Sequence, residues 1–147
     1  MIEQFIERWH KYLKGQLPEG LDGLLAEDVI FYSPVVYTPQ EGREITKLYL
    51  AAAASTFGDE ENEGGGASGQ ARSDPDAFRY TKQILSGNQA VLEFESRVGG
   101  KYVNGVDILE CNDEGKLIEF RVMIRPLQAV NMMHQQMGAI LKKMEAG

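Results

Sequence analysis

The chain has 147 residues, of which 43% are hydrophobic and 25% charged, a balance typical of one soluble domain with a real core. Its formal net charge of -7, without any run of Lys or Arg, argues against nucleic-acid binding, because phosphate contacts require clustered cations. The single cysteine, Cys111, excludes an internal disulfide framework and fits a reducing compartment.

The N-terminal segment "MIEQFIERWHKYLKG" has no apolar stretch typical of a secretory signal. No run of about eighteen apolar residues, the length of a membrane span, occurs in the sequence. We therefore expect a cytoplasmic protein with a single domain over residues 1–147 that does not bind a membrane.

The first part of the chain predicts three helices and a short strand. Apolar residues at helical spacing predict an amphipathic helix that ends near Gly15. Pro18 predicts the start of a second, short helix. Residues 28–34 (DVIFYSP) predict a strand, and residues 43–57 predict an Ala-rich helix that stops at Gly58. The apolar positions of the first helix are Ile2, Phe5, Ile6, Trp9 and Leu13.

Residues 58–76 form a segment that is acidic at first and then rich in Gly and Ser. Because this segment has almost no apolar content to offset the entropy of ordering, we predict a mobile surface loop. The loop could be a lid over a pocket, or an insertion without a functional role.

The rest of the chain predicts four strands and a final helix. The runs "FRYTKQIL", "AVLEFESRV", "YVNGVDILEC" and "KLIEFRVMIR" are separated by short turn sequences, which predict an antiparallel meander. Pro126 then begins a helix with an apolar stripe. Because the predicted helices come first along the chain and the antiparallel sheet follows, we predict an α+β domain. The predicted stripe consists of Leu127, Val130, His134, Met137, Leu141 and Met144.

Two of these strands separate an apolar face from a charged face. Leu92, Phe94 and Ser96 alternate with charged residues in one, and Phe120, Val122 and Ile124 do so in the other. We predict that Glu93 or Glu95 pairs with Arg121 or Arg125 across the outer face, in a solvated or interfacial salt ladder.

Asp107 does not fit this pattern. It shares a strand face with Leu109 and Cys111, while Val106 and Ile108 occupy the other face. Because both faces are apolar, periodicity does not say where the carboxyl points. It could be bonded to the backbone or to an arginine, or it could be kept in an apolar cavity for chemistry, where burial raises its pKa.

The segments "AEDV", "SP", "GRE" and "VDILECNDEGKLIEFRVM" resemble the SnoaL-like members of the nuclear transport factor 2-like (NTF2-like) superfamily, from about Phe5 to Arg125. The resemblance implies a cone in which a curved antiparallel sheet wraps around N-terminal helices and one apolar pocket, with a C-terminal helix added. That fold hosts ketosteroid isomerases, polyketide cyclases, dehydratases, epoxide hydrolases, binders and scaffolds, so it implies no single activity.

By this resemblance, Asp107 matches the aspartic acid that ketosteroid isomerases use as a hydrogen-bond donor to a developing enolate. The outer ladder implies a homodimer through Glu93, Glu95, Arg97, Arg121 and Arg125. The implied pocket residues, which would bind a small hydrophobic molecule, are Trp9, Ser33, Tyr49, Leu92, Phe94, Ser96, Leu109, Phe120, Val122 and Ile124.

The departures from the isomerase pattern concern the other catalytic groups. Ser33 stands where the isomerases carry their general base, and a serine hydroxyl does not replace a carboxylate without an activating partner. Trp9 falls near the oxyanion tyrosine and can donate a hydrogen bond but not shuttle a proton. Tyr49 could supply a pocket tyrosine. Gly105 replaces the arginine of the epoxide hydrolases.

His10 and His134 are the only histidines, and neither has a second ligand at metal-binding spacing, so we predict no metal and no cofactor. His134 near Asp107 would form an acid/base pair, with His10 as a weaker candidate. Three functions stay open: an isomerase, cyclase or dehydratase-type enzyme with Asp107 as proton donor, a non-catalytic binder of a small hydrophobic metabolite, and a dimeric interaction scaffold.

Overall fold

The computed structural model describes residues 1–53, 78–98 and 100–146. The predicted loop at 58–76 and the end of the predicted third helix lie outside these ranges. None of the helices in the described part of the chain has the length and apolar character of a membrane span. The helices are α1 (Ile2–Leu13), α2 (Gly20–Leu24), α3 (Arg43–Ala53) and α6 (Leu127–Ala146). The strands are β1 (Leu25–Tyr32), β2 (Gln40–Glu41), β3 (Arg79–Ser86), β4 (Gln89–Val98), β5 (Lys101–Cys111) and β6 (Leu117–Arg125).

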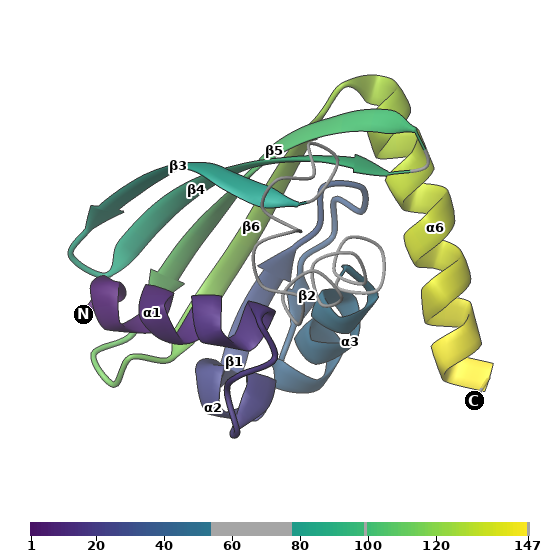
Figure 1. Ribbon diagram of the computed structural model, residues 1–147. Helices are drawn as coiled ribbons and strands as arrows, with labels where there is room; N and C mark the ends of the chain where they lie inside the picture. The colour runs from purple at the N-terminus through teal and green to yellow at the C-terminus, as the bar shows by residue number, and fades with distance from the viewer. Residues whose placement is uncertain (54–77, 99, 147) are drawn as a thin grey trace.

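The described strands form one curved, six-stranded sheet in the order β2-β1-β6-β5-β4-β3 (Figure 1). The predicted meander of β3, β4, β5 and β6 is confirmed, because each pairs antiparallel with the next. The sheet as a whole is mixed rather than antiparallel, since β1 pairs parallel with β6. The short second helix, α2, ends at Leu24, and Leu25 begins β1.

One face of the sheet is covered by α1, α2 and α3, while α6 lies at the end of the sheet beyond the β4–β5 hairpin (Figure 1). The apolar face predicted for α1 is buried, at Ile2, Phe5, Ile6 and Trp9. This helix packs with β1 and the inner faces of β4, β5 and β6 in the larger of two core clusters. The α+β cone predicted from the resemblance is therefore confirmed.

The buried stripe of α6 differs from the predicted one. Met137 is buried as predicted, but Leu127 is 74% exposed and His134 is exposed, whereas Ala129 and Met133, outside the predicted stripe, are buried. The buried residues form the second core cluster with Phe94 and Val103 of the sheet, so the helix turns Met133 and Met137 toward the core.

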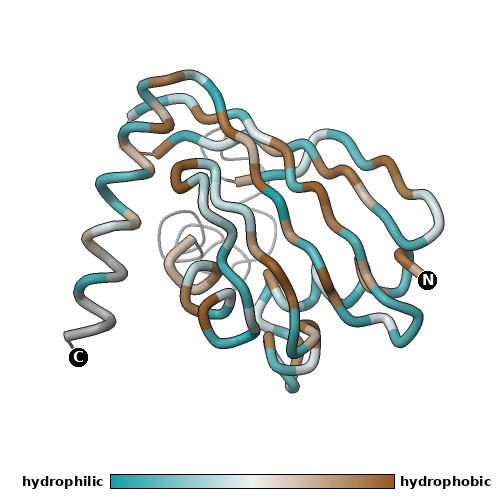
Figure 2. Tube along the Cα trace, turned by 180° about the vertical axis from the view of Figure 1, so that it is seen from behind, coloured by the Kyte–Doolittle hydropathy of each residue, from teal (hydrophilic) through white to brown (hydrophobic). Residues whose placement is uncertain are grey.

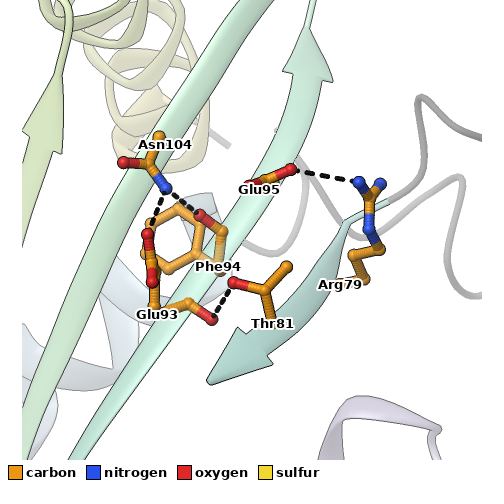
Figure 3. Close-up of polar contacts among 6 residues, drawn as sticks. All are labelled: Arg79, Thr81, Glu93, Phe94, Glu95 and Asn104. Atoms are coloured by element: carbon orange, nitrogen blue, oxygen red, sulfur yellow. Dashed lines mark hydrogen bonds and ion pairs between the residues drawn. The ribbon is translucent and has the colours of Figure 1, made fainter. Parts of the chain in front are cut away.

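The charged residues predicted on the outer face alternate with inward-facing residues, but they have other partners than predicted, and Figure 3 shows those of Glu93 and Glu95. Glu95 pairs with Arg79 of β3 at 3.0 Å, and Glu93 accepts a hydrogen bond of 3.0 Å from the Asn104 amide. Asn104 in turn accepts a hydrogen bond of 2.7 Å from Arg125 Nε. The predicted direct pairing across to the last strand is wrong, because β5 lies between β4 and β6 and separates them by about 10 Å.

Arg121 likewise interacts with residues close to it and not with Glu93 or Glu95. Its guanidinium lies 3.9 Å from the centre of the Tyr32 ring and 3.5 Å from Glu119 on the same strand. Arg97 is exposed at the end of β4. Figure 2 shows the chain from behind, with hydrophobic and hydrophilic residues alternating along several strands of the sheet, as expected where successive side chains point to opposite faces.

Candidate functional site

A cavity of about 320 Å³ lies between the inner face of the sheet and the helices. Its described walls are mostly apolar and rich in aromatic rings. They consist of Trp9, Tyr12, Leu13, Gly15, Phe31, Pro34, Leu50, Ala53, Phe78, Tyr80, Phe94, Asp107, Phe120, Val122, Ile124, Met133 and Met137. A cavity of this kind suits a small apolar molecule.

Asp107 reaches this cavity from the middle of β5. It pairs with Leu92 of β4 on one side and Val122 of β6 on the other, and only 5% of it is exposed. Val106 and Ile108, its neighbours in the chain, point to the outer face and are half-buried. The Asp107 side chain, whose direction periodicity left open, therefore points into the cavity.

Tyr80 is the hydrogen-bond partner of this carboxyl. Its hydroxyl donates to Asp107 Oδ2 at 2.9 Å, and it accepts a hydrogen bond of 3.0 Å from Trp9 Nε1. A helix and two strands that are far apart in sequence thus place three polar groups in one line. No other described residue hydrogen-bonds to the Asp107 carboxyl, so its Oδ1 atom is available to a molecule in the cavity.

The environment of Asp107 favours its protonated form. Burial raises the pKa of the carboxyl from 3.8 to about 7, although the hydrogen bond from Tyr80 acts in the opposite direction by favouring the charged form. A carboxyl that titrates near neutral pH can donate or accept a proton under ordinary conditions, which is what general acid–base chemistry needs.

The aromatic wall beside Asp107 depends on a glycine. The rings of Phe78, Tyr80 and Phe94 contact one another, with centroids 5.1 to 6.4 Å apart. Phe94 lies over Gly105 of β5, where an added Cβ atom would come within 2.5 Å of the ring and 2.6 Å of the Met123 carbonyl oxygen. Gly105 therefore permits the close approach of Phe94 that forms this wall.

The structure brings some of the predicted pocket residues to the cavity and not others. Leu92 and Leu109 are fully buried in the core, and Ser96 is buried on the inner face of β4. Tyr49 packs its ring against Phe31, with centroids 5.3 Å apart. These four residues are not among the described walls. The predicted residues that line the cavity are Trp9, Phe94, Asp107, Phe120, Val122 and Ile124.

Ser33 has a local role. Its hydroxyl oxygen accepts hydrogen bonds from the backbone N–H groups of Val35 and Val36, at 3.0 and 3.2 Å. A serine that caps a turn in this way stabilises the end of β1 before Pro34, which lines the cavity. The hydroxyl has no described base beside it.

The two histidines lie apart from the Asp107 carboxyl. His10 Nε2 is 2.8 Å from the Gln83 side-chain oxygen, and its ring meets the edge of Tyr80 with centroids 5.7 Å apart. His134 is exposed on α6 and does not line the cavity. Over the residues that the structure describes, no three His, Cys, Asp or Glu side chains gather as a metal site would require.

Sequence reasoning missed Tyr80, Tyr12 and Phe31 as cavity residues. Tyr80 belongs to the run "FRYTKQIL", in which strict alternation would have paired it with Lys82 on one face. The register of β3 and β4 shifts between Tyr80 and Lys82, so Tyr80 and Gln83 face inward while Lys82 faces out. A bulge of this kind has no clear signal in a single sequence.

No protein-family model matches the chain, and no curated protein matches it. Solved structures do. A steroid delta-isomerase from Pseudomonas aeruginosa is similar over 99% of this chain and 95% of its own, with a TM-score of 0.79 and 26% identity. An NTF2-like protein from Mesorhizobium loti covers 85% of this chain and 91% of its own, with a TM-score of 0.62 and 17% identity.

A SnoaL-like-family protein from Agrobacterium tumefaciens is similar over 85% of this chain and 97% of its own, with a TM-score of 0.54 and 13% identity. These comparisons agree with the topology: the chain has the NTF2-like, SnoaL-like fold. Neighbours with this fold include isomerases and cyclases, which is consistent with either a catalytic or a binding role.

Proposed function

We propose that the protein binds a small apolar molecule that carries a carbonyl or similar oxygen, and that Asp107 donates a proton to this oxygen in an isomerase-, cyclase- or dehydratase-type reaction. The observation that carries the proposal is a single carboxyl, buried among aromatic rings, whose pKa is raised to about 7. At neutral pH much of Asp107 is then protonated and can donate.

The physical basis is charge development in a dry cavity. When an enolate or alkoxide forms, negative charge gathers on oxygen, and a donor placed there in advance stabilises it more than water would. The described walls around Asp107 are mostly apolar, and Trp9 and Tyr80 already use their donors within the chain, so few described donors compete for that oxygen. Removal of this donor from the cavity should therefore lower the reaction rate strongly.

The likeness to a steroid delta-isomerase, at 26% identity, supports an isomerase-type reaction on an apolar ketone. The usual base of such enzymes is a carboxylate, whereas this chain has Ser33, whose hydroxyl caps a turn. Asp107 is the sole carboxyl among the described residues that line the cavity. This second observation favours the alternative, a non-catalytic binder that holds the same oxygen through Asp107.

The simplest ligand test uses Trp9, the only tryptophan of the chain, which lines the cavity. We expect 2-decalone, a bicyclic ketone without ultraviolet absorption of its own, to change Trp9 fluorescence on binding to the wild type at pH 6. Asp107→Leu should weaken this binding about tenfold, because one hydrogen bond to the ketone is lost. The exposed Glu114→Gln variant is the matched control.

The same samples separate the two functions. In D₂O, an enzyme should accelerate deuterium incorporation next to the ketone carbonyl: solvent takes the hydrogen of the α-carbon as a proton, the Asp107 donor stabilises the enolate oxygen, and solvent returns a deuteron to the carbon. Asp107→Leu should abolish that acceleration. Binding without accelerated exchange would leave the non-catalytic binder. Equal affinity of the wild type and Asp107→Leu for the ketone would remove Asp107 from the site altogether.

We also propose that the outer face of the sheet joins two copies of this chain. Its centre is apolar, because Ile84, Val91 and Ile108 form one row across three strands, next to the half-exposed Met123. Charges of both signs surround this centre, with Glu93 and Lys82 paired across strands. A two-fold axis through such a patch would place opposite charges against each other.

For this interface we expect Met123→Glu to convert a dimer into a monomer, since the two-fold axis would bring two buried carboxylates together. Light scattering after size-exclusion chromatography at micromolar concentration measures the mass directly. Gln16→Glu, which adds the same charge at an exposed position outside the sheet, should stay dimeric. A monomeric wild type would contradict the proposal.

A further inference from the structure

We infer that Trp9 and Tyr80 are positioning residues that fix the Asp107 proton on Oδ1, so that the cavity selects molecules with a hydrogen-bond acceptor, such as a ketone, over apolar molecules that lack one. The inference rests on the proposed function for the identity of the site. It adds which group donates and which accepts in the hydrogen bonds from Trp9 to Tyr80 and from Tyr80 to Asp107, and the class of ligand that this order favours.

The direction begins at Trp9. An indole N–H can only donate, so the 3.0 Å contact between Trp9 Nε1 and the Tyr80 oxygen has one polarity. The Tyr80 oxygen is thereby an acceptor on its α1 side. Its own single proton is left for the contact on the opposite side, with β5.

That contact is the 2.9 Å hydrogen bond to Asp107 Oδ2. Because Tyr80 donates to Oδ2, the proton of the neutral carboxyl is best placed on Oδ1, to which no described residue hydrogen-bonds. Hydrogen bonds in such a chain polarise one another, so the indole also makes Tyr80 a better donor.

A neutral Asp107 then presents an O–H donor to the cavity. A ketone or ether oxygen satisfies this donor, whereas a hydrocarbon of the same shape leaves a buried polar group unpaired and should bind about tenfold more weakly. Above its titration the carboxylate can only accept, so the preference for acceptor ligands should disappear at high pH.

Among the described residues, few groups could alter the titration of Asp107. Tyr80 on β3 contacts the carboxyl directly, Tyr12 on α1 lines the same cavity, and His10 on α1 touches the edge of the Tyr80 ring. The residues of β4, β6, α3 and α6 that face Asp107 across the cavity are apolar.

The test compares 2-decalone with decalin, its parent hydrocarbon, through Trp9 fluorescence between pH 5 and 9. The wild type should prefer the ketone about tenfold at pH 5.5 and lose this preference by pH 9. Asp107→Asn should keep the preference at every pH, because its amide oxygen accepts from Tyr80 and its NH₂ group faces the ligand. Asp107→Leu should show no preference.

Tyr80→Phe provides the decisive comparison. It should lower the ketone preference at low pH, because the proton is no longer held on Oδ1. It should also move the midpoint at which the remaining preference is lost to higher pH, since the hydrogen bond that favours the carboxylate is gone. Carboxyl-¹³C NMR of the ligand-free protein should show the same upward shift of the Asp107 midpoint, and a smaller one in Trp9→Phe.

Two results would overturn the inference. If the wild type keeps its full ketone preference at pH 9, the hydrogen bond to the ligand does not come from the Asp107 proton. If the ligand-free Asp107 midpoint does not move in Tyr80→Phe, the directed chain does not exist. If deuterium exchange is not accelerated, but the ketone preference and the shift of the Asp107 midpoint are both observed, catalysis is removed from the proposed function. This inference then still holds.

Discussion

Asp107→Asn is expected to be more stable than the wild type at pH 8 and nearly equal to it at pH 4. A carboxyl whose pKa is raised on folding, from 3.8 to about 7, holds its proton more tightly in the native state. The native state therefore gains from protonation at low pH. This stability is fully present below the ordinary pKa of 3.8 and is lost as the pH rises through about 7.

The size of the effect follows from the same values. The interval from 3.8 to about 7 corresponds to about 4 kcal/mol of stability that the wild type loses between acidic and mildly alkaline pH. Asparagine has the same shape, keeps an oxygen for the Tyr80 hydroxyl and does not ionise. Its stability should therefore lack this part of the pH dependence.

Urea unfolding between pH 4 and 8, followed by Trp9 fluorescence, measures the free energy of unfolding of both proteins. The difference between Asp107→Asn and the wild type should grow with pH over this range. Asp28→Asn, at an exposed carboxyl, serves as the control for the loss of one charge. A constant difference between Asp107→Asn and the wild type would show that Asp107 is ionised in water-like surroundings.

The elements near the site could be predicted from sequence where one periodicity decides the matter. The α1 face that carries Trp9 and the inner faces of β4 and β6 follow helical and alternating spacing, and the structure places them as predicted. Asp107 could be singled out as unusual, because a carboxylate between Val106 and Ile108 breaks the pattern of an otherwise apolar strand. Its direction needed the pairing with Leu92 and Val122.

What could not be predicted depends on irregular pairing or on long-range contact. The register shift after Tyr80 reverses the alternation of β3. Simple alternation therefore does not predict that Tyr80, the hydrogen-bond partner of Asp107, faces inward. The parallel pairing of β1 with β6 joins segments about ninety residues apart, which no local pattern reports. The methionine face of α6 is likewise chosen by its contacts with the sheet, because helix spacing allowed more than one stripe.

Gly105→Ala is expected to destabilise the protein by about 3 kcal/mol, the upper part of the range for overpacking a well-packed core. The added methyl group would lie 2.5 Å from Phe94 Cζ and 2.6 Å from the Met123 carbonyl oxygen. The ring can move aside, but the carbonyl belongs to the neighbouring strand β6 and can move only with the sheet. Because Gly105 is two residues before Asp107, affinity for 2-decalone should also fall.

A second substitution tells these two contacts apart. Phe94→Leu in the Gly105→Ala background removes the ring contact and should restore part of the lost stability, while the contact with the Met123 carbonyl persists. The control is Gly138→Ala, within α6, where an added Cβ meets nothing within 4 Å. There the higher helix propensity of alanine should stabilise the protein by up to about 1 kcal/mol. If Gly105→Ala were as stable as the wild type, Phe94 would not lie over β5, and the aromatic wall beside Asp107 would be arranged differently.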